Sequence, residues 1–482
     1  MSQTTESAAS QHTSLRKDAV GLLGILFFVL SAQAPLTGVV GAAALAVALG
    51  NGAGAPGAYV IVGAVLLLFS VGYTTMARRV DCRGGFYAIV RAGLGRDVGS
   101  IASWLALISY TTIQAAMYGL YGVTTAGLLQ AHLGLAVPWW VVVAVTGVIV
   151  YGLGVCNIEA GARVLAVLVI GEVTILLAMS AGVLMTGGGP DGLDLAASFS
   201  PGAILVGAPG IAILFAIASM FGFESTAIYA GEAKDPNRTI PRATYTAVVA
   251  IALFLAFLMW ILITYYGAGA AQQRALETLA DDPASFVLVP MTEILGSWAA
   301  DVAAVLLSTS LFAGILAFHN VINRYLHAMA LNGELPNRLA QTNRFQAPAV
   351  AAAVQTVSVT LVVAPFAVAG LDPLTTLFAW LSGQAVATLV ALYLLTSAAI
   401  IAYFRRNPGA TTWTGVVAPA LSVVCMTGEL ALIAGNFQVL TGGSVTTCVL
   451  LLGSVPVVAL AGWLVARGAR RPVGMPTPEL VD

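Results

Sequence analysis

The stretch SAQAPLTGVVG, residues 31–41, interrupts the first long apolar run of this chain. That run covers residues 19–48, which as a straight helix would measure about 45 Å, well beyond the roughly 30 Å of a bilayer's hydrocarbon core. Pro35 lacks an amide donor, and the glycines that follow it lower the cost of non-helical backbone. The stretch therefore predicts a membrane helix that is unwound near residues 37–40. In lipid, such a patch is tolerated only inside protein or beside a cavity.

The same residues could instead end a cleaved secretory signal, because Ala32-x-Ala34 has the small-residue pattern of a cleavage site. Cleavage would remove the first span and leave Pro35 at the new N-terminus. It would also remove the cytoplasmic N-terminus that the loop charges described below require. We therefore favour the broken helix.

The composition identifies a membrane protein. Of the 482 residues, 59% are hydrophobic and 9% are charged, whereas globular proteins carry about 25% charged residues. The lipid bilayer is thus an expected partner. The formal net charge of −1 gives no reason to expect nucleic acid as another partner.

Windows of about 20 apolar residues predict twelve transmembrane spans. Lys and Arg concentrate in cytoplasmic loops. With the N-terminus inside, all of the twenty Lys and Arg residues except Arg274 fall on the cytoplasmic side. One missed span would reverse every later loop, so the pattern supports the count and two cytoplasmic termini, and we expect the protein in the plasma membrane. The spans are expected at residues 19–48, 56–77, 98–130, 138–156, 160–186, 206–232, 242–266, 298–322, 348–369, 373–403, 415–438 and 445–466.

A second interruption, FAIASMFGFES at residues 215–225, lies in the sixth span. Spans one and six are five helices apart. Because five is odd, two five-helix units would lie in the membrane with opposite orientations, as in the inverted repeats of secondary transporters. The predicted fold class is all-α integral membrane, with broken helices one and six and two extra C-terminal helices. The expected organisation is a cytoplasmic N-terminal tail (1–17), a first repeat (18–205), a second repeat (206–404), helices eleven and twelve (405–468) and a cytoplasmic C-terminal tail (469–482).

Two of the loops are long. Residues 187–205 are glycine-rich and acidic and are expected to form an external loop. Within residues 267–297, the sequence AQQRALETLADDP has enough helix formers for a short interfacial helix. No soluble domain is expected.

An unwound helix exposes amide donors on one half and carbonyl acceptors on the other. The amides suit a carboxylate and the carbonyls suit an ammonium group, and an α-amino acid carries both. We expect the first break to bind the carboxylate and the second to bind the amine, although simple packing defects at Gly and Pro are the alternative. The predicted substrate-binding residues are Thr37, Gly38, Val39, Val40 and Gly41 in the first break and Phe215, Ala218, Ser219, Met220, Phe221 and Gly222 in the second.

Three glutamates lie within predicted spans, where a charge costs at least about 2.5 to 3.5 kcal/mol. Glu172, near mid-depth in the fifth span, is the predicted proton-coupling residue; a permanently protonated structural role is the alternative. Glu224 beside the second break is a predicted gate or pocket residue, or else a local cap. Glu429 lies outside the repeat and is interpreted as structural.

Other side chains carry weaker hypotheses. Phe221 and Phe223 flank Gly222 and could close over a substrate as a thin gate, with core packing as the alternative. His319 is interpreted as an interfacial hydrogen-bonding residue near the end of the eighth span. Further polar residues could line a pocket or bind sodium, but packing is at least as good an explanation: Tyr110, Gln114 and Tyr118; Trp380 and Gln384; Ser308, Thr309 and Ser310.

Three motifs resemble the amino acid-polyamine-organocation permeases. GFESTAIYAGEAKDPNRTIPRA (222–243) is similar to their sixth helix and following loop. RGGFYAIVRAGLG (83–95) resembles the amphipathic stretch before helix three, and NRYLHAMALNGELP (323–336) resembles the end of helix eight. The resemblance implies the twelve-helix fold with a five-helix inverted repeat and the transport of amino acids, polyamines or related amines.

The chain departs from that family's pattern at two places. Many members carry a Gly-Ser-Gly-like run at the first break, where this sequence has APLTGVVGA (34–42). In cation-independent members a lysine stands near the position of Glu172 in place of a bound sodium. A glutamate cannot replace that cation, which is why proton binding or cation ligation is considered for it.

The sequence thus predicts a secondary active transporter for amino acids that works by alternating access as a proton symporter. An amino acid or polyamine exchanger and a transporter of cationic amines are the alternatives. An enzyme is not expected, since the sequence has no nucleophile motif, cofactor fingerprint or zinc-ligand spacing, and no cofactor or metal is predicted. A channel is disfavoured because the sparse polar residues converge at mid-depth.

Overall fold

The computed structural model describes residues 22, 25, 26, 29, 33, 35–80, 85–156, 162–224, 226, 235–281 and 284–468. These residues are helical apart from turns, loops and an isolated bridge between Gly189 and Gly192, which confirms the all-α prediction for the described part of the chain. The two predicted tails, 1–17 and 469–482, and the first part of the first predicted span lie outside the described residues.

Among the described residues, eight helical stretches are long and apolar enough to cross a membrane. A long apolar run becomes helical in lipid because every backbone donor and acceptor must then be satisfied within the segment. The helices that correspond to predicted spans two to twelve are α4 (Ala55–Ala77), α6 (Arg96–Leu133), α7 (Trp139–Val155), α8 (Ala162–Met185), α11 (Pro209–Ser219), α12 (Pro236–Tyr266), α15 (Ser297–Leu331), α16 (Ala349–Val368), α17 (Ala379–Arg406), α18 (Ala418–Leu440) and α19 (Val445–Gly468).

The first segment is not unwound at residues 37–40, so that prediction is wrong. The short helix α3 (Pro35–Thr37) continues into the π-helix η1 (Gly38–Ala43), and Thr37 has helical dihedrals of φ −61° and ψ −42°. Wide π-turns absorb the distortion that the sequence led us to expect as unwinding. Packing favours a small residue here, since a Cβ on Gly41 would lie 2.7 Å from Cδ2 of Leu120, which would have to shift.

Helical geometry in this segment is lost further along the chain. A second π-helix, η2 (Ala46–Asn51), contains Gly50 with φ −96° and ψ −119°, and the 3-10 turn η3 (Gly52–Gly54) follows. These residues lead into α4, so the main bend of the first segment lies at its end rather than at its middle.

The sixth segment is interrupted where the sequence predicts it. Helix α11 ends at Ser219, and the chain turns through Gly222, whose φ of 105° strongly favours glycine. Phe223 and Glu224 then form part of a 3-10 turn. Residues 227–234 lie outside the described residues, and α12 begins at Pro236.

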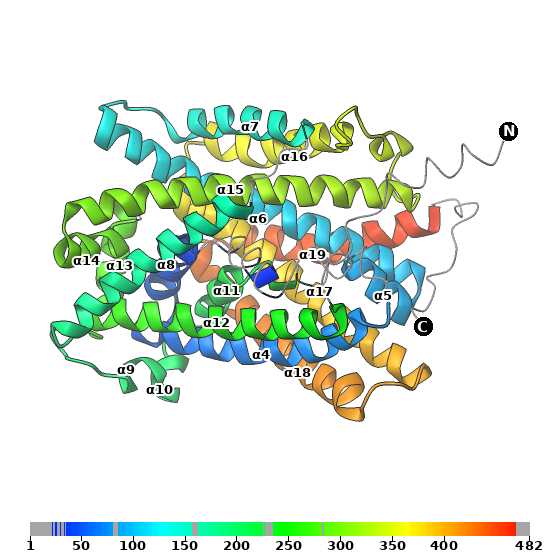
Figure 1. Cartoon of the computed structure of the whole chain (residues 1–482), viewed down its shortest axis with the longest axis horizontal. Coiled ribbons are helices and arrows are strands. Elements are labelled where there is room, and N and C mark those ends of the chain that lie inside the picture. The colour runs from blue at the N-terminus through cyan, green and yellow to red at the C-terminus, as the bar shows by residue number, and fades with distance from the viewer. Residues whose placement is uncertain are drawn as a thin grey trace.

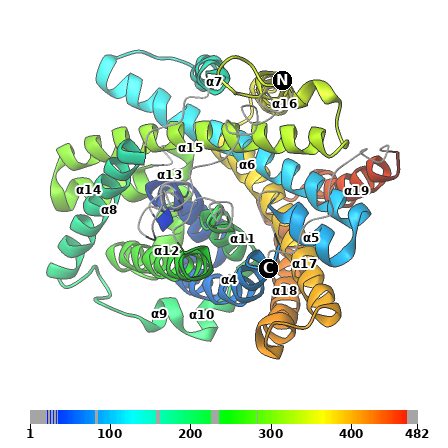
Figure 2. The same ribbon diagram turned by 45° about the vertical axis from the view of Figure 1, so that its right-hand side comes forward.

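The helices pack around α6 and α17, which run beside each other through the middle of the molecule (Figure 1). Helix α4 packs against α12, and α11 packs against α18. Helices α7 and α16 contact each other and lie at the outer edge, beyond α15 (Figures 1 and 2). The two interrupted segments, η1 and α11, are in contact inside this assembly.

The loops contain more helix than the sequence analysis anticipated. The expected interfacial helix is α13 (Ala271–Asp281), and a further helix, α14 (Ser285–Leu295), follows it. The amphipathic stretch before the third span is α5 (Phe86–Leu94). Within the expected external loop, residues 187–205, two short helices form: α9 (Ala196–Phe199) and α10 (Pro201–Leu205).

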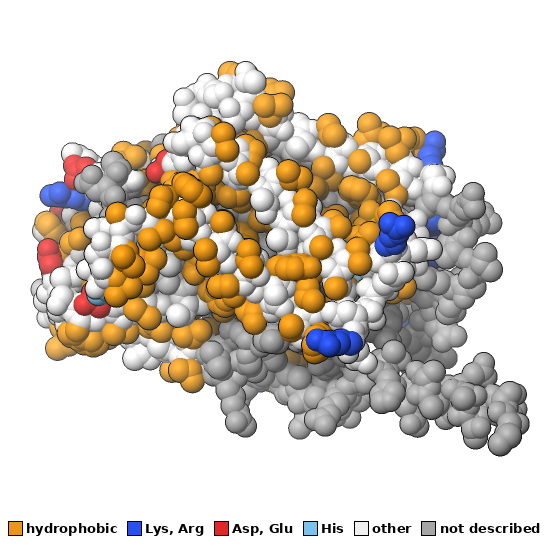
Figure 3. Space-filling model, turned by 90° about the horizontal axis from the view of Figure 1, so that it is seen from above, with side chains coloured by type: hydrophobic (Ala, Val, Ile, Leu, Met, Phe, Trp, Pro, Cys, Tyr) orange, Lys and Arg blue, Asp and Glu red, His pale blue; other side chains and the backbone are white. Residues whose placement is uncertain are grey.

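The surface agrees with a membrane location. Figure 3 shows hydrophobic side chains spread over the middle of the visible face, while acidic and basic side chains lie towards its two ends. Contiguous apolar surface of this extent exceeds what soluble monomers expose.

Candidate functional site

A small cavity of about 40 Å³ lies between the two interrupted segments. The first segment contributes Gln33, Thr37, Gly38 and Ala42, and the second contributes Ala218, Ser219 and Phe221. The remaining walls come from α6, α15, α17 and the π-helix η7 (Pro373–Phe378): Ile113, Met117, Phe318, Phe378 and Ser382.

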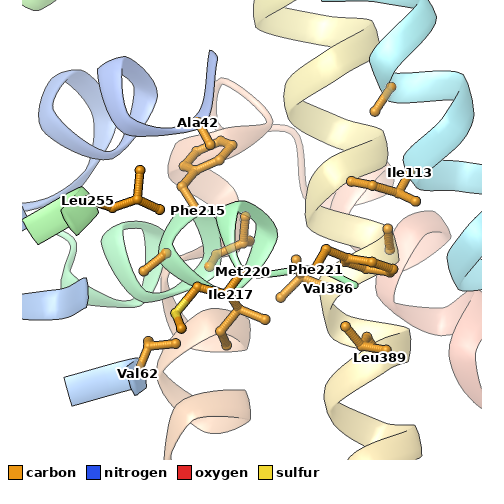
Figure 4. Close-up of a cluster of buried hydrophobic side chains, with 14 of the residues drawn as sticks. Ala42, Val62, Ile113, Phe215, Ile217, Met220, Phe221, Leu255, Val386 and Leu389 are labelled. Carbon is orange, nitrogen blue, oxygen red and sulfur yellow. The ribbon is translucent and has the colours of Figure 1, made fainter. Parts of the chain in front are cut away.

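The cavity unites five of the predicted binding residues, namely Thr37, Gly38, Ala218, Ser219 and Phe221. The other six do not line it. Val39, Val40, Phe215 and Met220 are buried in the apolar core around it, Gly41 packs against α6, and Gly222 forms the turn after α11. Figure 4 shows part of that core, with Phe221 beside Val386 and Ile113.

Three polar atoms of the cavity lining have no hydrogen-bond partner among the described residues. They are Oε1 of Gln33, Oγ1 of Thr37 and Oγ of Ser382, and all three side chains are buried. Buried polar groups are nearly always paired in folded proteins, and an unpaired one costs about 1–3 kcal/mol. Three such atoms around one cavity are available to a ligand.

The carbonyls at the second break are largely occupied by protein donors. Nε2 of Gln33 donates to the Met220 carbonyl at 3.0 Å, and the Phe221 amide donates to the Ala218 carbonyl at 3.4 Å. The Ser219 hydroxyl donates to the Phe215 carbonyl at 2.9 Å and also lies 3.0 Å from the hydroxyl of Tyr59. A carbonyl oxygen has two lone pairs, so the Met220 carbonyl, with its one bond from Gln33, can still accept another hydrogen bond.

Glu172 lies at the first break. Its Oε2 accepts a hydrogen bond from the Leu36 amide at 3.0 Å, and its side chain is fully buried. Its other oxygen, Oε1, has no partner among the described residues. The backbone amide that binds a carboxyl group here is thus that of Leu36, one residue before the predicted carboxylate-binding residues 37–41. The carboxyl group is a side chain of the protein rather than a substrate.

Glu224 has the equivalent position at the second break. Its Oε2 accepts the Gly222 amide at 3.0 Å. Tyrosine hydroxyls of α6 and α17 complete its surroundings, because Tyr110 donates to Oε1 at 3.1 Å and Tyr393 donates to Oε2 at 3.2 Å. A third hydroxyl, from Tyr73 of α4, donates to the Glu224 carbonyl at 3.0 Å. We call these three side chains the tyrosine cage.

The two candidate gate residues differ in location. Phe221 lines the cavity and packs edge-on against Tyr110 and Phe318, with ring centroids 5.7 and 6.0 Å apart. Phe223 is fully buried outside the cavity lining, against Phe69 and Tyr393. The geometry therefore leaves Phe221 as the aromatic side chain of this pair at the cavity.

A larger apolar cavity of about 250 Å³ adjoins the first and shares Gln33, Gly38 and Ser219 with it. Its other walls come from the first segment, α8 and α12, and include Pro35, Val173 and Leu255. The interrupted segments thus have open space on both sides of the contact between Gly38 and Ser219.

Sequence reasoning missed Gln33 and Ser382. The signal for Gln33 was a lone amide side chain in an apolar run two residues before Pro35. Ser382 had no such signal, because serine is common in membrane helices. Tyr110 was noted only for its helical spacing with Gln114.

The remaining candidates are spread through the fold. Glu429 is buried in α18 with an unpartnered Oε1, away from both breaks in sequence. Ser308 accepts a hydrogen bond from Thr125 at 3.3 Å, and the Thr309 hydroxyl donates to its own helix. The Ser310 hydroxyl lies against the carboxyl of Glu172. His319 is buried, and its Nε2 has no partner among the described residues.

Comparisons with known proteins show which protein family this chain resembles. The sequence profile of the family described as "Amino acid permease" matches residues 20–460. The chain is 24% identical over 385 residues to the L-lysine transport protein of Corynebacterium glutamicum, covering 76% of this chain and 72% of that protein. It is 26% identical over 337 residues to a probable GABA permease of Pseudomonas aeruginosa, covering 65% and 66%.

Among solved structures, the manganese transporter of Eremococcus coleocola is similar, with a TM-score of 0.58 and 16% sequence identity. The match covers 92% of this chain and 94% of that one. At this identity the likeness is one of fold alone.

The family profile, the permease relatives and the apolar helices agree with one another. They confirm the predicted resemblance and identify a multi-pass membrane protein for amino acid transport, with a small-molecule amino acid as its substrate, rather than an enzyme. The chain belongs to the family of amino acid permeases.

Proposed function

We propose that this permease is a secondary active transporter that takes up amino acids by alternating access, with a proton as the coupling ion. The observation that carries the proposal is the cavity between the interrupted segments, where Gln33, Thr37 and Ser382 each present an unpartnered polar atom. Main-chain irregularity at a cavity inside the membrane is typical of transporter substrate sites.

The proposed topology has twelve transmembrane helices with both termini in the cytoplasm of a cell whose plasma membrane holds the protein. Residues 18–205 and 206–404 form the two inverted repeats, and two further helices follow. The distribution of Lys and Arg among the loops supports this orientation.

Substrate binding would use the polar atoms at both breaks. The hydroxyl of Thr37 can donate to a substrate carboxylate, and the oxygens of Gln33 and Ser382 can accept from an amine. The Met220 carbonyl, which accepts one hydrogen bond from Gln33, keeps a lone pair for the same amine. In this form the cavity is too small for a large ligand, so binding would require the walls to move apart.

Glu172 is the proposed coupling residue. When it is ionised, its carboxylate holds the Leu36 amide, a bond between an anion and a backbone donor that is stronger than one between neutral groups. Protonation weakens that bond and releases the amide towards the substrate carboxylate. Proton binding and substrate binding would then favour each other, which is what symport requires.

A cationic amine is the second candidate substrate, and an exchange mode would suit it. The observation that favours it is the pair of buried carboxylates, Glu172 and Glu224, one beside each break. The L-lysine transport protein and the probable GABA permease are named for substrates that contain an amine. Small neutral amino acids remain the first choice because the cavity lining beyond the breaks is apolar.

Uptake into proteoliposomes tests the proposal. Purified protein would be given radiolabelled alanine, lysine or GABA with and without an inward proton gradient. Saturable uptake that the gradient stimulates is expected for at least one of them. Uptake that is equal with and without the gradient, but accelerated by substrate inside the vesicle, would replace symport by exchange. Non-saturable flux would overturn alternating access.

A further inference from the structure

A third cavity, of about 370 Å³, lies between the outer pair of helices, α7 and α16, and the inner pair, α6 and α15. It is separate from the substrate cavity, because Gln114 and His319 line it while their neighbours Ile113 and Phe318 line the other. Most of its lining is apolar. A volume of this size is typical of small-molecule pockets.

The cavity opens towards the lipid. Its lining includes Val148 and Trp140, whose side chains are 72% and 50% exposed, on the outermost helix α7 (Figure 2). Exposed apolar side chains continue along α16 at Val357 and Leu361. In a membrane protein these faces contact acyl chains, so a ligand would enter from the bilayer rather than from water.

One polar group in the cavity has no partner. The imidazole of His319 is 2% exposed, and its Nε2 makes no hydrogen bond within the described part of the chain. Glycine on α7 leaves room for this ring, since a Cβ on Gly154 would lie 3.0 Å from Nε2. An imidazole nitrogen left unpaired in an apolar environment is costly unless a ligand completes it.

Three of the neighbouring polar side chains already hydrogen-bond within the protein. Gln114 donates to the Ile315 carbonyl at 3.0 Å and accepts from Gln355 at 2.8 Å. The hydroxyls of Thr356 and Thr360 donate to carbonyls of their own helix. The polar group of an occupant can therefore meet two side chains of the lining, the imidazole of His319 and the hydroxyl of Tyr118, and the variants below distinguish them.

We propose that this cavity binds a single-chain amphiphile from the membrane, whose hydroxyl or carboxyl group hydrogen-bonds to Nε2 of His319 and whose hydrocarbon chain fills the space between α7 and α16. Fatty acids and fatty alcohols share this chemistry. A plain hydrocarbon fills the same space but leaves the imidazole unpaired, and a ligand without the polar group should bind more weakly.

Fluorescence quenching by brominated probes tests the site, because Trp140 lines it. The full chain in lipid nanodiscs would be titrated with 12-bromododecanoic acid, 12-bromododecanol and 1-bromododecane. We expect saturable quenching by the acid or the alcohol at concentrations at least about tenfold below those needed for bromododecane. The saturable part should disappear in Trp140→Phe. Quenching that never saturates, or that is the same for all three probes, would overturn the proposal.

A matched pair of variants on α7 checks the location. A Cβ on Gly147 or on Gly152 meets no atom within 4 Å, so a side chain fits at both, but only Gly147 lines the cavity. Gly147→Leu should abolish saturable quenching, and Gly152→Leu should leave it unchanged. If Gly147→Leu is not monodisperse, Ala364→Leu fills the same space from α16 and carries the same expectation.

His319→Leu separates the polar contact from the apolar one. It should remove the preference for the acid and the alcohol while bromododecane still binds. A preference that survives in this variant would show that His319 is not the contact, and the assignment would fail.

Discussion

The Leu36 amide donates a hydrogen bond to Oε2 of Glu172 at 3.0 Å, joining the first membrane segment to α8. A second glutamate repeats this relationship, since Glu224 accepts the Gly222 amide at 3.0 Å. A buried carboxyl of the protein thus accepts a backbone amide both in α3 of the first segment and at the turn after α11. A substrate carboxylate can therefore bind these two amides only if it displaces the glutamate side chains or if the glutamates are protonated.

Glu172→Gln tests coupling directly. Glutamine keeps an oxygen acceptor for the Leu36 amide, so the protein should fold and its thermal stability should change little. Because the amide cannot titrate, proton-gradient stimulation of uptake should fall to the level measured without a gradient. Uptake in proteoliposomes with and without the gradient measures this. Glu429→Gln, another buried membrane carboxyl, is the control and should retain stimulation; full stimulation in Glu172→Gln would rule out its coupling role.

Tyr393→Phe tests the tyrosine cage around Glu224. The substitution removes one hydrogen bond to a buried carboxylate, and hydrogen bonds to charged groups contribute about 1.5–3 kcal/mol. The midpoint of thermal unfolding in detergent should therefore fall. Tyr118→Phe removes a hydroxyl from α6 at another site and is the comparison. Equal midpoints for the two variants would mean that the cage contributes nothing to stability.

Ser382→Ala and Thr37→Val test the substrate cavity, because thermal stability and substrate affinity should not fall together in these variants. Each removes a buried oxygen that has no partner in the described structure, so the free protein should be as stable as before or more stable. Substrate binding should weaken, which a smaller ligand-induced rise in unfolding temperature would reveal. A less stable protein that binds substrate normally would assign these residues to packing instead.

Glu334, in the turn after α15, predicts a pH dependence of stability. Burial raises the pKa of this carboxyl above its ordinary value of 4.5, although hydrogen bonds from Ser100 and Ser103 and, after them, the charges of Arg96 and Arg91 act in the opposite direction. The folded state therefore binds its proton more tightly than the unfolded state, and the stabilisation is complete below pH 4.5. It is lost as the pH rises through the folded-state pKa, where the buried carboxylate becomes a penalty.

Glu334→Gln should remove that penalty. Thermal unfolding at pH 7 should occur at a higher temperature in the variant than in the natural protein, and at pH 4 the two should agree. Glu277→Gln, on the exposed surface of α13, should have no effect at either pH. A variant that is less stable at pH 7 would show that the arginines outweigh burial.

Residue patterns predicted the long helices, the interruption at Gly222 and the positions of Glu172 and Glu224 inside the helical assembly. They could do so because lipid imposes helical hydrogen bonding on apolar runs, and because a carboxyl inside a span needs a reason to be there. They could not predict which polar groups remain without a hydrogen-bond partner. That depends on contacts between distant segments, such as the bond from Gln33 to the Met220 carbonyl across 187 positions.

The first interruption illustrates the same limit. Pro35 and the glycines after it predicted unwinding at residues 37–40, whereas the chain forms a π-helix there. Local residue types allow either outcome, and the close approach of Gly41 to Leu120 of α6 is a property of the packed molecule. Ser382 was unpredictable for a related reason, since only the cavity distinguishes it from other membrane serines.

The tyrosine cage links α4, α6 and α17 to one residue of the sixth segment. If one of these helices withdrew alone, Glu224 would lose one of these hydrogen bonds in a medium without water. Intermediate positions are therefore high in free energy, and the helices should separate together or not at all. The sixth segment would then have two stable positions. The transition between them, rather than diffusion of the ligand, would limit the rate of each transport cycle.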